Sequence, residues 1–236
     1  MRFHLPEPMH GWREFVGEIA IVVVGVLIAL AAQQVVESWS WQQKVTAAEQ
    51  TMNEEIKNSL LGVAELNRLA KCSTTQLEAM QDAIVRGDQV KARQILHRGT
   101  AFGVSRLWAD NAFEATLSAQ VSDHLGAAKL KSYSQVYQMI RQIRKIQETK
   151  ESAASDLGVL YFLPEFPFSP EHRYAQLRQV TDTRLWLLAM RGSGEPLVHY
   201  AKKDLGLEVT QRDYLAAPGR AENIKQCEAD AAAVAS

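Results

Sequence analysis

The side chains able to do chemistry are spread thinly along this chain of 236 residues. The six histidines are His4, His10, His97, His124, His172 and His199. They form no HExxH pair and join no cysteine or carboxylate at the spacing of metal ligands. The sequence also lacks a GxSxG nucleophile turn, a GxxxxGK[ST] phosphate loop and a GxGxxG dinucleotide motif. We therefore predict no catalytic residue, no metal and no cofactor, and expect a protein that is not an enzyme.

The two cysteines, Cys72 and Cys227, have two interpretations. They form no CxxC motif, and an even pair in an exported domain usually closes a disulfide. The alternative is two unrelated buried thiols. We favour the disulfide, which would stabilise the fold by up to ~5 kcal/mol in the chain-entropy model, less any strain.

Three further patterns have ordinary structural explanations that we prefer. Arg86-Gly87-Asp88 spells an adhesion tripeptide but has the composition of a helix end. A basic patch interleaved with acids is typical of a solvated helix face; it consists of Arg141, Arg144 and Lys145 with Glu148 and Glu151. Four aromatic residues would suit a ligand pocket, although core packing is the commoner role; they are Trp108, Tyr133, Tyr137 and Trp186.

Charge and composition restrict the class of partner. The chain has 26 Lys and Arg against 27 Asp and Glu. Without the two arginines and three glutamates before residue 19, 24 of each sign remain. Such balance disfavours a nucleic-acid partner and gives no long-range attraction for charged polymers. None of the seven prolines lies between residues 9 and 163, which favours long helices over strands and turns.

One segment near the N-terminus is apolar enough to cross a membrane. Residues 19–32 contain no charged or strongly polar side chain, and about 20 helical residues span a hydrocarbon core of ~30 Å. We predict a transmembrane helix over residues 15–36, after a cytoplasmic or interfacial stub over residues 1–14. The residues expected to anchor its ends at the membrane interface are Trp12, Arg13, Trp39 and Trp41.

Two other interpretations of this segment are weaker. Ala29-Leu30-Ala31 would suit signal-peptide cleavage, but Glu7, Glu14 and Glu18 make a poor export signal. A buried helix of a soluble protein would explain the apolar residues, but Val and Ile on every face with Trp at both ends fit lipid better.

Three residues of the membrane helix are candidates for contact with another helix. Glu18 is costly inside a membrane, so it would pair with a cation on a partner, relay protons, or lie at headgroup depth. We prefer headgroup depth. Gly25 and Ala29 share one face and would admit close helix approach, although such spacing also arises by chance.

The cations indicate the orientation of this helix. Arg2 and Arg13 precede it, whereas the nearest cation after it is Lys44. The positive-inside tendency therefore predicts a cytoplasmic N-terminus and a periplasmic domain beyond the helix.

The first forty residues resemble a known family. The segments are HGWREF at residues 10–15, GEI at 17–19, VGVLIAL at 24–30 and QVVE at 34–37. Together they resemble the N-terminal signature of an uncharacterised family of single-pass proteobacterial inner-membrane proteins. The resemblance implies a Gram-negative inner-membrane setting. It carries over no functional residue.

Beyond the membrane the pattern predicts an all-α domain. Apolar residues at three- and four-residue steps continue the membrane helix through residues 45–86, which end at Gly87-Asp88. Further helices are expected over residues 89–97, 105–121 and 126–160. Another should begin at Ser169-Pro170 and end at Gly192-Ser193-Gly194, before shorter helices over 196–204 and 220–234.

These helices would form an antiparallel bundle over residues 37–204, with the C-terminal segment 205–236 tied to it by the disulfide. The loop over residues 161–170 is proline-rich and apolar. If exposed, it would dock a partner through Phe162, Phe166 and Phe168; the alternative, which we prefer, is a lid folded on the core.

The sequence thus favours a non-enzymatic accessory or scaffold subunit of an inner-membrane complex. Its expected partners are the lipid bilayer and another membrane protein or a second copy of this chain, with no nucleic acid. The alternative is a periplasmic ligand-binding sensor bundle that signals through a partner membrane protein.

Overall fold

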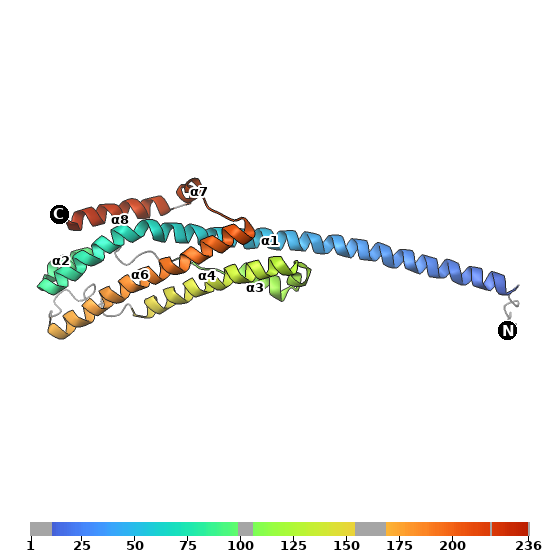
Figure 1. The fold of residues 1–236 in the computed structure, drawn as a ribbon, viewed down its shortest axis with the longest axis horizontal. Helices are drawn as coiled ribbons and strands as arrows, with labels where there is room; N and C mark the ends of the chain where they lie inside the picture. The colour runs from blue at the N-terminus through green and yellow to red at the C-terminus, as the bar shows by residue number, and fades with distance from the viewer. Residues whose placement is uncertain (1–10, 99–105, 154–168, 218, 236) are drawn as a thin grey trace, which may run out of the picture. The chain divides into compact units, whose positions relative to one another are not determined.

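The structure is a computed structural model that describes residues 11–98, 106–153, 169–217 and 219–235. Within these ranges it contains seven α-helices and one short 3-10 helix, and no strand (Figure 1). The chain divides into two compact units, Met1–Ala47 and Ala48–Ser236. The predicted all-helical class is confirmed for the described residues.

Helix α1 (Trp12–Arg86) runs for 75 residues and includes both the predicted membrane segment and the outer helix that follows it. It ends at Arg86, directly before the Gly87-Asp88 pair that predicted its end. Gly87 takes a left-handed conformation at φ 76°. Its N–H donates to Ile84 O at 3.1 Å, and Asp88 N–H donates to Ala83 O at 2.8 Å. This is the bonding pattern of a glycine-terminated helix, in which the last free carbonyls find donors.

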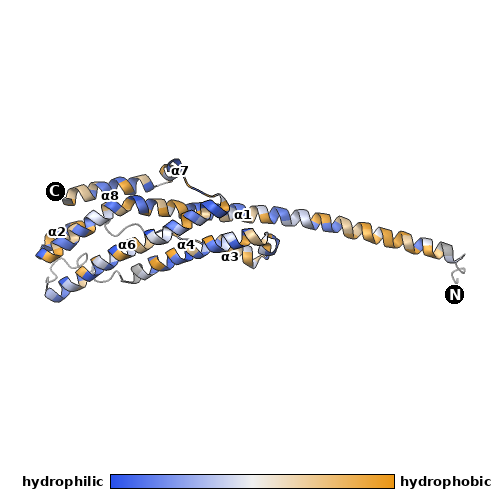
Figure 2. Cartoon of the chain, viewed as in Figure 1, coloured by the Kyte–Doolittle hydropathy of each residue, from blue (hydrophilic) through white to orange (hydrophobic). Residues whose placement is uncertain are grey.

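The first unit consists of residues up to Ala47, and hydrophobic residues predominate in its helix between residues 15 and 36 (Figure 2). The most apolar window of 18 residues has a mean hydropathy of 2.7, and none of it is buried. By length and composition, α1 contains the one candidate membrane span among the described residues.

The core of the second unit begins where α4 (Ala127–Ala153) packs on α1. Tyr133 donates from its hydroxyl to Asn53 Oδ1 at 2.8 Å, and Tyr137 donates to Met52 O at 3.3 Å. The residue numbers of the contact partners rise in the same direction along both helices, so α4 runs parallel to this part of α1.

Helix α6 (Pro170–Leu205) runs in the opposite direction along α1. Arg184 donates to Gln81 at 3.1 Å, and Arg191 donates to Asn67 at 3.4 Å. Fully buried apolar side chains from all three helices fill the space between them; they include Met52, Ile56, Leu60, Val136, Ile140, Ile143, Val180, Met190 and Leu197. The burial of such side chains is the main source of stability for this unit.

The predicted start of α6 is confirmed, but its predicted end is wrong. The Ser169 hydroxyl caps the helix by accepting from His172 N–H at 3.3 Å. The helix then continues through residues 192–194 and Pro196 instead of stopping and restarting. Gly194 is a packing residue, because a Cβ there would lie 2.6 Å from Val63 Cγ1 on α1.

Replacing Gly194 by alanine is therefore expected to lower the free energy of unfolding by about 1–3 kcal/mol, as overpacking does. The matched control is Gly192→Ala on the same helix, where an added Cβ meets nothing within 4 Å. G192A is expected to raise stability by about 0.5–1 kcal/mol, the helix preference of alanine over glycine. Urea unfolding followed by far-ultraviolet circular dichroism measures both. Equal shifts in the two variants would contradict the packing role.

The predicted helix over 105–121 is also wrong. Residues 106–110 are irregular, α3 covers only Asn111–Ser118, and a 3-10 helix, η1, follows at Val121–His124. Gln120 separates these last two with a left-handed backbone at φ 58°. The cause is long-range: side chains of α1 and α4 hold residues 106–110, as shown below.

Three short helices complete the described chain. Helix α2 (Gln89–Arg98) begins where the Asp88 carboxylate accepts from Lys91 N–H at 2.9 Å. Helix α7 (Gln211–Ala216), which the sequence analysis missed, begins with a reciprocal cap between Thr210 and Asp213. Helix α8 (Arg220–Ala235) was predicted to within one residue.

Candidate functional site

The candidate contact residues of the membrane helix are exposed. The side chains of Glu18 and Ala29 and the backbone of Gly25 are all exposed to solvent. A Cβ added at Gly25 would meet nothing within 4 Å. This part of α1 is therefore an exposed apolar surface in the structure.

The candidate interfacial anchors are described only in part. Trp12 and Trp39 are exposed, and Trp12 lies 6.1 Å from the Phe15 ring. The Lys44 ammonium lies 4.2 Å from the centre of the Trp41 ring, which is a cation–π contact. The side chain of Arg13 lies outside the described residues, as do Phe162, Phe166 and Phe168.

A disulfide joins Cys72 on α1 to Cys227 on α8 across 155 residues, with the two Cα atoms 5.7 Å apart. Both cysteines are buried against Leu69. Gln76 adds a hydrogen bond from Nε2 to Cys227 O at 3.2 Å. The predicted bridge is thus present, and it fixes α8 along the C-terminal third of α1 (Figure 1).

The four aromatic residues that sequence analysis assigned to packing are buried in the second unit; they are Trp108, Tyr133, Tyr137 and Trp186. The Trp186 indole donates to Ile146 O of α4 at 3.0 Å. The Tyr137 ring stacks on the Phe113 ring, with the two ring centres 4.8 Å apart. Burial is the main cause that raises the Tyr137 pKa, and the nearby Glu55 carboxylate is the second cause. Core packing explains these residues, although Trp108 also borders a pocket.

Residues 106–110 are held against α4 by the side-chain amide of Gln147. Its Oε1 accepts from Arg106 N–H at 3.1 Å and from the Trp108 indole at 2.9 Å. Its Nε2 donates to Arg106 O at 3.0 Å. The amide thus satisfies both backbone groups of Arg106, which would otherwise bond along a helix.

A carboxylate from α1 then starts helix α3. Glu55 accepts from the backbone N–H groups of Asn111 and Ala112, each at 3.1 Å, and from the Tyr137 hydroxyl at 2.9 Å. The first N–H groups of a helix lack partners within the helix, and a negative charge beside them is favourable. Glu55 therefore replaces the local cap, because the side chain of the N-cap residue Asp110 makes no capping hydrogen bond.

The predicted solvated basic face needs a correction. Arg144 pairs with the largely buried Asp110 at 2.6 Å, and Arg141 reaches the same carboxylate at 3.5 Å. The hydrogen bond from Arg144 is the main cause that lowers the Asp110 pKa below its usual value. These two arginines fix residues 106–110 to α4, so they do more than solvate a helix face.

This arrangement predicts acid sensitivity. Because the Asp110 pKa is lower in the folded protein than in the unfolded chain, its stabilising effect is complete above about pH 4 and is lost as pH falls through the folded value. Asp110→Asn is expected to reduce the loss of unfolding free energy between pH 6 and pH 2, measured by urea unfolding. Asp204→Asn, at an exposed acid near the end of α6, is the control. Identical pH profiles for wild type and D110N would contradict the assignment.

On the other side of residues 106–110, a buried acid of α1 accepts hydrogen bonds from two other segments of the chain. The Glu65 side chain is 1% exposed. Arg106 donates to both of its oxygens, with Nε at 2.6 Å from Oε2. Asn223 of α8 donates to Oε1 at 3.1 Å. The hydrogen bond to the Glu65 carboxylate is the main cause that raises the Arg106 pKa.

Arg220, the first residue of α8, lies beside the same acid. Burial is the main cause that lowers its pKa; the Arg106 charge acts in the same direction and Glu65 opposes it. Its Nη1 atom is buried and has no hydrogen-bond partner among the described residues. The guanidinium of Arg68 on α1 lies over the Tyr214 ring, with its Cζ atom 4.7 Å from the ring centre. Two guanidinium groups therefore depend on one buried carboxylate.

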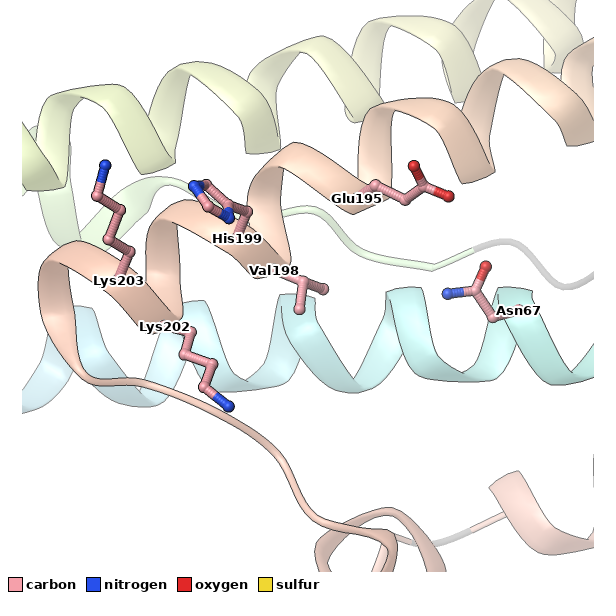
Figure 3. A pocket seen from close by; sticks show the side chains of 6 residues that line it. All are labelled: Asn67, Glu195, Val198, His199, Lys202 and Lys203. Carbon is pink, nitrogen blue, oxygen red and sulfur yellow. The ribbon is translucent and has the colours of Figure 1, made fainter.

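A pocket of about 530 Å³ adjoins this group of charges. Its walls come from α1, from residues 106–109 and from Arg220; the α1 residues are Thr51, Glu54, Glu55, Asn58, Ser59 and Gly62. A second pocket, of about 570 Å³, lies between Asn67 of α1 and the last turns of α6 (Figure 3). Its α6 side chains are spread along an open helix face. Among the described residues, no group of three His, Cys, Asp or Glu could hold a metal ion.

Sequence analysis missed Glu65, Arg106 and Arg220. One signal could have found Glu65. A second stripe of residues recurs on α1 at three- and four-residue steps, at Gly62, Leu69, Cys72 and Gln76. Glu65 belongs to this second stripe, and a disulfide at Cys72 requires that it face the C-terminal segment. Nothing local marks either arginine.

No family model matches this chain, and neither a curated protein nor a solved structure matches it.

Proposed function

We propose that the protein is a non-enzymatic accessory or scaffold subunit of a bacterial inner-membrane complex. The observation that carries this proposal is the apolar, wholly unburied window of α1, followed in the same helix by the core of a folded helical domain. Such a helix anchors the domain in the bilayer and leaves a side for contact with a partner helix. The resemblance of residues 10–37 to a single-pass inner-membrane family points to the same setting.

The second unit would then lie in the periplasm. The disulfide between Cys72 and Cys227 supports this orientation, because structural disulfides persist in the periplasm and are rare in the cytosol. The positions of the cations support it independently, because Arg2 and Arg13 precede the apolar segment whereas the nearest cation after it is Lys44. Phosphatase fused after Ser236 should be active, since this reporter works only in the periplasm. An inactive phosphatase fusion with an active cytoplasmic reporter at the same site would refute the orientation.

The partner test uses the full chain, tagged at its C-terminus and purified from native membranes in mild detergent. We expect a second membrane protein, or a second copy of this chain, to co-purify. Gly25→Leu enlarges the face that carries Ala29 and should reduce the co-purified amount. Leu27→Ala, on the opposite side of the helix, should not. A lone monomer from wild-type membranes would refute the scaffold role.

The pocket beside Arg220 favours a second candidate function, a ligand-binding sensor that signals through a partner membrane protein. Its volume of about 530 Å³ lies within the range of roughly 300–1,000 Å³ that small-molecule sites occupy.

A further inference from the structure

We propose that the pocket bordered by α1, residues 106–109 and Arg220 binds a small organic monocarboxylate, with the Arg220 guanidinium as its charge partner. Every residue that borders this pocket belongs to the second unit. The inference goes beyond the scaffold role and would give the second candidate function its ligand class. It is tested by ligand binding alone, so its outcome is separate from that of co-purification.

The charges beside the pocket favour an anionic ligand. Glu65 is the one buried carboxylate described beside Arg106 and Arg220. Both of its oxygens already accept from Arg106, and Oε1 also accepts from Asn223. The half-buried guanidinium of Arg220 is therefore left without a counter-ion of its own, and a bound anion would supply one.

Arg220 also has a hydrogen-bond donor that is not used within the described chain. Nη1 of Arg220 has no hydrogen-bond partner among the described residues, although the side chain borders the pocket. Because Nη1 itself is covered, a rotation of the guanidinium about its last torsion angles would bring this atom to the pocket. A carboxylate accepts two parallel hydrogen bonds from such a group.

The acids of the pocket limit the charge of the ligand. Glu54 and Glu55 border its far end, and the Glu55 oxygens are engaged by Asn111, Ala112 and Tyr137. Glu55 and Glu65 are ten residues apart on α1, or about 15 Å along the helix axis. A single carboxylate near Arg220 avoids these acids, whereas a longer polyanion would meet them.

The remaining wall favours a ligand with an apolar body. Trp108 packs against Gly62, where an added Cβ would lie 3.0 Å from Trp108 Cη2. Leu107 stands at the rim with 87% of its surface exposed. An aromatic or branched monocarboxylate would cover Leu107 while its carboxylate meets Arg220.

The test is isothermal titration calorimetry on the full chain in detergent, with sodium benzoate as the probe and benzamide as the neutral ligand of the same shape. We expect benzoate to bind at least about tenfold more tightly than benzamide. Arg220→Met should weaken benzoate binding at least about tenfold. Lys225→Met removes the same charge from an exposed position of α8 and should leave benzoate binding unchanged.

Three results would overturn the proposal. They are no benzoate binding up to about 10 mM, equal binding by wild type and R220M, or equal affinity for benzoate and benzamide. Sodium sulfate at the same ionic strength separates an organic carboxylate from an inorganic oxyanion; tighter sulfate binding would refute the ligand class. R220M should unfold at the same or a higher temperature than wild type, since it removes a half-buried guanidinium that shares its buried counter-ion with Arg106. Its loss of binding would therefore not reflect loss of fold.

Discussion

Replacing both cysteines by serine, C72S/C227S, is expected to lower the free energy of unfolding of the helical domain by about 4–5 kcal/mol. The bridge closes a loop of 155 residues, so its loss greatly increases the freedom of the unfolded chain. It also holds α8, whose buried apolar contact near the bridge is a small cluster around Leu69 with Ile224 and Ala231.

Urea unfolding of the full chain in detergent, followed by circular dichroism, measures this loss. Wild-type protein unfolded with a thiol reductant present should show the same loss, since reduction opens the same loop. The double variant should be insensitive to the reductant, which separates the covalent link from any effect of the serine side chains. An unchanged unfolding midpoint in the double variant would contradict the prediction.

Local signals were sufficient to predict much of this fold. The absence of proline over residues 9–163 permits the 75-residue α1, and the Gly87-Asp88 pair ends it through bonds that involve only neighbouring residues. Ser169-Pro170 likewise starts α6 within its own first turn. In each case the determining contacts lie within about five residues in sequence, so the sequence pattern carries them directly.

Residues 192–194 of α6 are a case in which local sequence signals predict the wrong structure. A Gly-Ser-Gly run followed by proline is typical of a helix end, yet α6 continues to Leu205. Gly194 is small because Val63 of α1 lies against it, 131 residues earlier in the chain. Tertiary packing overrides the low helix preference of these residues, and a single sequence does not reveal that neighbour.

The candidate site was unpredictable for the same reason. Residues 106–110 leave the helical pattern because Gln147, Arg144 and Glu65 bind their backbone and side chains from 34 to 41 residues away. Arg220 acquires its unusual environment from α1 and from Arg106. Cys72 and Cys227 were the one long-range pair that residue identity alone could suggest.

Glu65→Ala is expected to destabilise the helical domain by about 3–5 kcal/mol, because it leaves the Arg106 and Arg220 guanidiniums without their shared buried anion. It also removes the acceptor of Asn223 at the start of α8. Few single substitutions in this chain should cost as much, since most change stability by 0.5–3 kcal/mol. Urea unfolding of the full chain measures the loss.

The matched control is Glu78→Ala on the same helix. Glu78 pairs with Arg184 at 3.4 Å, but both side chains are exposed to solvent, so its removal should cost at most ~1 kcal/mol. A second variant separates loss of a partner from loss of the pair. E65L/R106L replaces both charges by apolar groups and should recover much of the stability lost in E65A, because breaking a buried pair costs more than replacing it. If E65A and E78A destabilise equally, Glu65 is not the shared counter-ion of the two arginines.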